Sequence, residues 1–192
     1  MVELMVTLVL LAILLALAMP SFSIWIRNSK VRAVADSLQT GLRLAQAEAL
    51  RRNRQVVFTL TNDSPTSSTH TPVQNGVNWS LNSVAAYVGD PVSYIESGVL
   101  TDVGSGVQIT GPAAICFNAL GRMVANDAPG FSGVACELPT TTPPVQAYQV
   151  GFASTTAGED RPLRVTVALG GQVRLCDPAK ALSANAPDGC PA

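Results

Sequence analysis

A continuous apolar segment at the start of the chain constrains its fold more than any other feature. The 23 residues from Leu4 to Ile26 carry no charged side chain, and a single carboxylate, Glu3, stands directly before them. A helix of this length rises about 35 Å, enough to cross the ~30 Å hydrocarbon core of a bilayer. Lipid offers no hydrogen-bond partners to backbone groups, so we expect residues 1–26 to form a helix that spans a membrane.

The helical pattern continues past Ile26 and becomes amphipathic. Pro20 lacks a backbone N–H, so we expect a kink or a local melting of the helix there. Over 27–54, apolar residues recur at spacings of three and four, which predicts one buried stripe. The stripe comprises Val31, Val34, Leu38, Leu42, Ala45 and Ala49. The chain should therefore begin with one helix of about 50 residues, whose second half docks on other elements.

Charge is segregated along the chain. Residues 27–54 hold seven basic and two acidic residues, a net charge of +5, whereas residues 55–192 hold five basic and ten acidic residues, a net charge of −5. The basic neck suits either the anionic headgroups of a nearby membrane or a specific partner, and the sequence leaves both open. The acidic balance of residues 55–192 disfavours a general affinity for nucleic acid.

After Asn53 the pattern becomes that of β-structure. Short runs rich in β-branched and aromatic residues, separated by Gly, Pro and Asn, predict strands. These runs are QVVFTLT, GVQIT, AAICF, GRMVA, QAYQVGFAS, LRVTVAL and QVRLC. Gly170 and Gly171 join the last two, which is typical of a hairpin, and one face of that hairpin should pack on the amphipathic helix. The predicted fold class is α+β, with a long N-terminal helix packed on the antiparallel β-sheet of a globular head over 55–192.

Two further groups of residues are assigned structural roles. The segment from Thr61 to Gly76 is rich in Ser, Thr, Pro and Asn without apolar periodicity, so we expect an exposed loop. Trp79, Phe117 and Tyr148 are expected to fill the core rather than to form a platform for a ligand.

The four cysteines of the chain all lie in its last 77 residues. They are Cys116, Cys136, Cys176 and Cys190. An even number confined to the head predicts two disulfides and an oxidising compartment. Three pairings are possible; we favour Cys116–Cys136 with Cys176–Cys190, because it closes two short loops. A zinc site is disfavoured, since there is no C-x-x-C pair and the only histidine, His70, is remote in sequence.

Nothing in the sequence indicates catalysis. There is one histidine in a polar segment, no G-x-S-x-G motif, no glycine loop suited to phosphate and no pair of carboxylates on one predicted element. We therefore expect a protein that is not an enzyme and that uses no cofactor, metal or small-molecule substrate.

The N-terminal segment VELMVTLVLLAILLALAMPSF resembles that of type IV pilins and type II secretion pseudopilins. Glu3 and Pro20 keep that family's separation of 17 positions. Three later segments are similar to the minor pilins of the FimT/FimU type and to the related GspH pseudopilins. They are AVADSLQTGLRLAQAEALRRN, ICFNALGRM and GGQVRLCDPAKALSANAPDGC. The resemblance covers most of the chain, although residues 62–112 match only loosely.

The resemblance implies a minor pilin, a structural subunit at or near the tip of a type IV pilus that helps to prime pilus assembly. Glu3 and Pro20 would be its assembly residues: the Glu3 carboxylate would pair with the N-terminal amine of a neighbouring subunit, and Pro20 would mark where the helix loosens. Other major and minor pilins would be the partners through the N-terminal helix. The subunit would first span the bacterial inner membrane once, with its head in the periplasm, and then join the pilus on the cell surface. A GspH-type pseudopilin of type II secretion is the alternative.

The position of Glu3 departs from the family pattern. Mature pilins begin with an N-methylated aromatic residue and carry the glutamate at their fifth position, whereas here it is the third residue. We therefore expect further residues before Met1, including a basic leader that ends in glycine. Such a leader would also reconcile two topology signals: the basic neck alone would hold the head in the cytoplasm, while paired cysteines require an oxidising compartment.

DNA is a further possible partner. Some FimT-type proteins are DNA receptors in natural transformation, an activity associated with a G-R-x-R motif. The matching segment here is GQVR, residues 171–174, so Gln172 replaces the first arginine. Arg174, Lys180 and Arg164 are the candidate residues left to contact phosphates.

Overall fold

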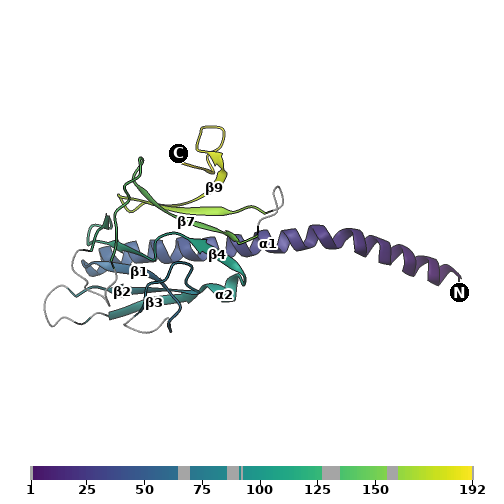
Figure 1. Ribbon diagram of the computed structural model, residues 1–192, viewed down its shortest axis with the longest axis horizontal. Helices are drawn as coiled ribbons and strands as arrows, with labels where there is room; N and C mark the ends of the chain where they lie inside the picture. Colours follow the sequence, from purple (N-terminus) through teal and green to yellow (C-terminus); the bar gives the residue numbers. More distant parts are fainter. Residues whose placement is uncertain are drawn as a thin grey trace.

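The structure, a computed structural model, describes residues 2–64, 70–85, 91, 93–126, 135–154 and 160–191, with the backbone alone described over 15–20. A single long helix, α1 (Val2–Arg52), precedes a β-rich head (Figure 1). The other elements are β1 (Val56–Thr61), β2 (Asn78–Ser83), β3 (Ser93–Val99), α2 (Leu100–Val103), β4 (Val107–Thr110), β5 (Ala114–Phe117), β6 (Met123–Val124), β7 (Val145–Phe152), β8 (Leu163–Ala168), β9 (Val173–Ala181) and β10 (Gly189–Cys190).

The described strands form two five-stranded sheets, with the orders β3-β2-β1-β5-β6 and β10-β9-β8-β7-β4. Neighbouring strands are antiparallel except β9 and β10, which are parallel. The second half of α1 lies between the sheets, with β1, β2 and β3 on one side and β7 and β9 on the other (Figure 1). The α+β fold class is confirmed, but two sheets hold the helix where one was predicted.

The predicted helix stripe is confirmed as part of the core. Val31, Val34, Leu38, Leu42, Ala45 and Ala49 are each at most 2% exposed, and Ala35 joins them. They share one cluster with residues from both sheets, which include Phe58 and Leu81 on one side and Tyr148, Val165 and Val167 on the other. These contacts show that α1 is buried on two sides, and each side packs against the apolar face of one sheet.

The predicted hairpin is also confirmed. β8 and β9 pair antiparallel, and the Gly171 N–H donates to the Ala168 carbonyl at 2.8 Å in the turn. Gly171 adopts φ 87°, a left-handed conformation that favours glycine. Val165, Val167 and Val173 point into the core, so the alternation read from the sequence selects the face that packs on α1.

The segment 62–112 differs most from prediction, because β2, β3 and α2 were not predicted. β2 reads NWSLNS, yet all six residues are buried, the polar ones included. His70 is also buried, against the expectation of an exposed loop, and its Nε2 forms a 2.9 Å hydrogen bond with Ser80 Oγ. Burial lowers the pKa of His70. Hydrogen bonds offset part of the cost of burying these groups, since Asn82 Nδ2 donates to Ser80 Oγ at 3.1 Å. Residues 65–69 of the predicted loop lie outside the described residues.

The first half of α1 bears on two predictions. The backbone is helical through Pro20, so the local melting expected there is not observed. Figure 1 shows α1 curving between its N-terminal part and the part that packs on the head. In the part of the chain that the structure describes, no helix is both long and apolar enough to cross a membrane. The membrane-spanning segment over 1–26 therefore stays a prediction.

Candidate assembly interface

The N-terminal half of α1 projects from the head (Figure 1). The exposed apolar residues are Val2, Leu4, Met5, Val6, Leu8, Val9, Leu10, Leu11, Ile13, Leu14, Phe22, Trp25 and Ile26. An exposed apolar surface of this extent normally marks contact with protein or lipid, because its exposure to water is unfavourable. This half of α1 is therefore the candidate assembly interface.

Glu3 lies in the first turn of α1 and is exposed, where a carboxylate interacts favourably with the helix dipole. Within the described residues, no hydrogen bond or ion pair engages its carboxylate. Four residues further along, Thr7 Oγ1 donates to the Leu4 carbonyl at 2.9 Å and so satisfies its hydroxyl within the helix. The Glu3 carboxylate is thus available to a group on another molecule. Pro20 lies in the same helix, and its role in assembly stays a prediction.

A polar clamp fixes the head to α1 where the exposed half begins. Arg27 Nε and Nη2 donate to Asp160 Oδ1 and Oδ2, each at 2.8 Å, and Nη2 also donates to the Ser154 carbonyl at 2.9 Å. The Arg27 guanidinium stacks over the Phe152 ring, 4.3 Å from its centroid. Asn28 Oδ1 adds a bond from the Arg161 backbone N–H at 2.8 Å. Because two-pronged arginine–carboxylate pairs have a fixed geometry, this clamp sets the direction in which the exposed half leaves the head.

The clamp was not predicted from the sequence. Arg27 counted there only as part of the basic neck, and Asp160 only toward the acidic balance of the head. No local pattern connects residues 133 positions apart, so only the packed fold could show the pair.

Comparisons with known proteins identify the family. The family model described as type II transport protein GspH matches residues 34–171, which is more than half of the chain. The chain belongs to the GspH family. No curated protein matches the sequence.

Solved structures extend this assignment to the fold. Two crystal forms of the type IV minor pilin FimU from Pseudomonas aeruginosa each match with a TM-score of 0.50, at 16% and 14% identity. The first match covers 78% of this chain and 95% of FimU, and the second covers 79% and 91%. The minor pseudopilin EpsH of the Vibrio cholerae type 2 secretion system matches with a TM-score of 0.43 at 14% identity, over 80% of this chain and 99% of EpsH. The FimU likeness shows that this GspH-family chain has the α+β pilin fold.

Disulfides hold two parts of this GspH-family head. The structure joins Cys116 to Cys136 and Cys176 to Cys190. The second bond closes the C-terminal tail against β9, where the Asp177 N–H also donates to the Asp188 carbonyl at 2.8 Å. Among the described residues, no group of three or more His, Cys, Asp or Glu side chains could hold a metal ion.

The residues predicted to contact DNA are only partly brought together. Arg164 and Arg174 are diagonal neighbours on adjacent strands, since Arg164 faces Cys176 and Arg174 faces Thr166. Arg174 Nη2 donates to the Pro187 carbonyl at 3.0 Å, so the tail engages its guanidinium. Lys180 forms ion pairs with Asp188 and Asp177, which raise the pKa of the lysine. Tail groups thus compete with phosphate for Arg174 and Lys180, and DNA binding stays a prediction.

The tail disulfide gives a testable prediction. In the double variant Cys176→Ser/Cys190→Ser, amide hydrogen exchange over residues 177–191 should rise by more than tenfold, because loop closure by such a bond contributes about 2–4 kcal/mol. Exchange in β7 and β8 should change little. The matched control is Cys116→Ser/Cys136→Ser, which should leave the tail protected; equal exchange in the tails of both variants would contradict the prediction.

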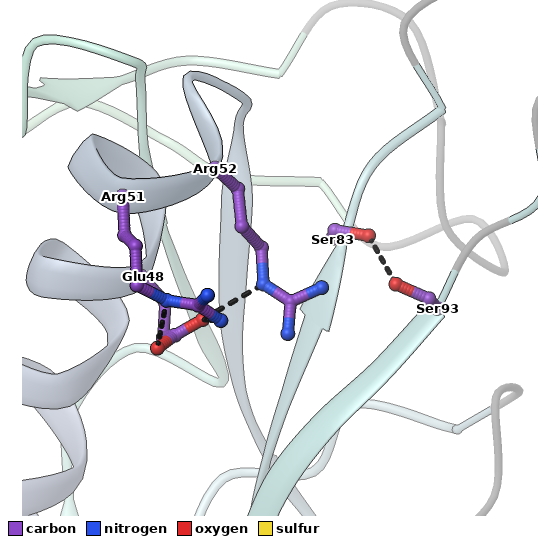
Figure 2. A network of polar contacts seen from close by, with 5 residues as sticks. All are labelled: Glu48, Arg51, Arg52, Ser83 and Ser93. Atoms are coloured by element: carbon purple, nitrogen blue, oxygen red, sulfur yellow. Dashed lines mark hydrogen bonds and ion pairs between the residues drawn. The ribbon is translucent and has the colours of Figure 1, made fainter.

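A charged clasp lies at the C-terminal end of α1 (Figure 2). Glu48 accepts from Arg51 Nε and Nη2 at 2.9 and 2.7 Å and from Arg52 Nε at 2.7 Å. Figure 2 shows the Arg52 guanidinium between Glu48 and Ser83, whose Oγ bonds Ser93 Oγ at 2.7 Å. The hydrogen bond from Arg51, followed by that from Arg52, lowers the pKa of Glu48 from 4.5 to about 2.

This clasp predicts a loss of stability in acid. Because the folded state lowers the Glu48 pKa, the ionised Glu48 carboxylate stabilises the fold above pH 4.5, and this stabilisation is lost as the pH falls toward 2. The free energy of unfolding of Glu48→Gln should lie about 1 kcal/mol below wild type at pH 7, and the gap should close near pH 2. Urea titrations at both pH values measure this. Glu137→Gln, which alters an exposed carboxylate outside the clasp, should follow wild type; a gap that does not depend on pH would refute the role of ionised Glu48.

Proposed function

We propose that this GspH-family protein is a minor pilin, a structural and non-catalytic subunit that sits at or near the tip of a type IV pilus and helps to prime its assembly. The observation that carries this proposal is the apolar half of α1, which projects uncovered from a clamped and folded head. Such a helix can enter a bundle of like helices and gain the burial that the isolated chain lacks. The head then remains outside the bundle as the surface that distinguishes this subunit.

Glu3 would direct this step. A carboxylate near an apolar phase is costly unless a positive group pairs with it. Before assembly, the apolar half would lie in the inner membrane with the head in the periplasm. The N-terminal amine of a neighbouring pilin would then supply the positive charge, so joining the filament would be favoured over remaining in the bilayer.

Glu3→Ala tests the assembly role. We expect the amount of this subunit in sheared, purified pili to fall at least about tenfold relative to the amount in the cell, because the variant has no charge for the neighbour to pair with. Immunoblots of both fractions measure the ratio. Thr7→Ala, a change in the same helix that removes no charge, should enter pili as wild type does. Normal incorporation of Glu3→Ala would refute the proposal for this residue.

The description of the matching family supports a second candidate, a minor pseudopilin of type II secretion. The two assignments share the helix and the pilin fold, so a cellular experiment must separate them. Deletion of the gene should reduce the number of surface pili if the protein is a minor pilin. If it is a pseudopilin, deletion should instead retain secreted enzymes in the periplasm and leave pili in place.

A further inference from the structure

A cleft opens beside the clamp, where α1 leaves the head. It has a volume of about 630 Å³, within the range of ligand sites in proteins. On the helix it is lined by Trp25, Asn28, Ser29 and Arg32, whose spacing of three and four places them on one stripe. The opposite wall comes from β8, β9 and the disulfide-closed tail. The cleft is therefore a built space between packed elements.

The wall of the cleft opposite α1 combines apolar side chains with charged side chains that form ion pairs with one another. Leu163 and Leu175, both partly buried against the core, belong to the strands that line it. On the tail side, Lys180 forms ion pairs with Asp177 and Asp188. Because Lys180 offsets much of this acidic charge, the tail wall repels an anion less than two free carboxylates would.

Two arginines supply available positive charge. Among the described residues, no hydrogen bond or ion pair engages the guanidinium of Arg161, whose backbone N–H is held by Asn28. Within the parts of the chain that the structure describes, Arg32 forms only a long 4.0 Å pair with Asp36, and both side chains are more than half exposed. Such a pair is weak in water, so Arg32 can turn to another anion at little cost. Guanidinium groups bind phosphate oxygens in two-pronged fashion, which makes a phosphate the matching ligand.

An aromatic pair connects the cleft to the exposed apolar half of α1. Trp25 lines the cleft and stacks on Phe22 with ring centroids 5.8 Å apart, and the two side chains are 64% and 61% exposed. Indole groups favour the boundary between hydrocarbon and water, since one part of the ring is apolar and the N–H is polar. A ligand held by Arg32 and Arg161 would thus have an apolar surface directly beside it.

We propose that this cleft binds the phosphate headgroup of an anionic phospholipid, whose acyl chains lie along the exposed apolar side chains of α1 that follow Trp25 toward the N-terminus. Arg32 and Arg161 bind the phosphate, and Trp25 packs against the start of the chains. The site goes beyond the proposed function, because it would bind lipid whether or not the subunit enters a pilus. Free phosphate shares the headgroup chemistry, so the experiment compares the two sources.

The test uses the full chain in neutral detergent micelles with equal amounts of phosphatidylglycerol and phosphatidylcholine. Native mass spectrometry gives the ratio of the two lipids retained. We expect wild type to prefer phosphatidylglycerol, and Arg32→Gln/Arg161→Gln to reduce that preference by about 25-fold, since each basic residue near an anionic lipid surface contributes about a fivefold change and the two changes multiply. Trp25→Ala should reduce retention of both lipids together.

Arg43→Gln/Arg122→Gln is the matched control, because it removes two exposed arginines that do not line the cleft. It should keep the wild-type preference, and circular dichroism should show that every variant is folded. The proposal is overturned if wild type shows no preference, if both double variants lose it equally, or if inorganic phosphate displaces the lipid at equal concentration. It is also overturned if Arg32→Gln/Arg161→Gln changes self-association of the chain without changing the lipid ratio, because the cleft would then be a protein interface.

Discussion

Gly171→Ala should lower the free energy of unfolding by about 3 kcal/mol, although it adds a single methyl group. The residue has φ 87°, and this left-handed conformation costs a non-glycine residue about 1–2 kcal/mol. A Cβ at this position would also overlap the Gly121 carbonyl oxygen and the Gln46 side-chain amide, which bond each other at 3.0 Å. Overpacking of this kind costs a further ~1–3 kcal/mol, because backbone cannot move aside as a side chain can.

The neighbouring glycine is a matched control. A Cβ at Gly170 would meet no atom within 4 Å, and this residue has no positive φ. Gly170→Ala should therefore stay within about 0.5 kcal/mol of wild type. Urea unfolding of both variants in mild detergent measures the difference. If Gly171→Ala and Gly170→Ala had equal free energies of unfolding, Gly171 would not be packed against Gly121 and Gln46 as the structure shows.

Leu38→Ala should destabilise the head by about 2–5 kcal/mol, the usual range when a fully buried leucine is truncated. Leu38 is 0% exposed, in the stretch of α1 that lies between the two sheets. Truncation leaves a cavity beside α1. Neither sheet can move in to fill it, because strand pairing and the remaining contacts with α1 hold both sheets in place. Helix propensity would not cause the loss, because alanine is a better helix former than leucine.

Leu50→Ala separates packing from helix propensity. Leu50 lies in the same helix but is 52% exposed, so its truncation should cost less than about 1 kcal/mol. Thermal or urea unfolding of both variants, followed by the signal of buried aromatic residues, gives the comparison. Losses of similar size would mean that the α1 stripe is not the centre of the core.

The sequence predicted the parts of this fold whose signal is local and periodic. The stripe from Val31 to Ala49 identified the buried face of α1, because a helix repeats every 3.6 residues whatever it packs against. The alternation around Gly170–Gly171 identified the β8–β9 hairpin and its inner face for the same reason. Glu3, the apolar run after it and Pro20 pointed to a pilin-type helix, and family membership and fold agree with that resemblance.

Segment 62–112 could not be predicted because its polar residues are buried by partners distant in sequence. Ser80 and Asn82 are polar, yet they lie in a buried strand whose backbone pairs with β1 and β3. Ser80 Oγ also bonds His70 Nε2 and accepts from Asn82 Nδ2. Hydrogen bonds of this kind reverse the usual cost of burial, and no local pattern records them.

The sequence by itself thus determined a long helix with an apolar first half, a buried stripe on its second half and a β-rich head. Only the tertiary structure decided that two sheets hold the helix, that Arg27 and Asp160 clamp it, and that Arg32, Arg161 and Trp25 meet at one cleft. The physical reason is the range of the interactions. Periodicity arises within one element, whereas ion pairs and clefts form between residues that only the packed chain brings together.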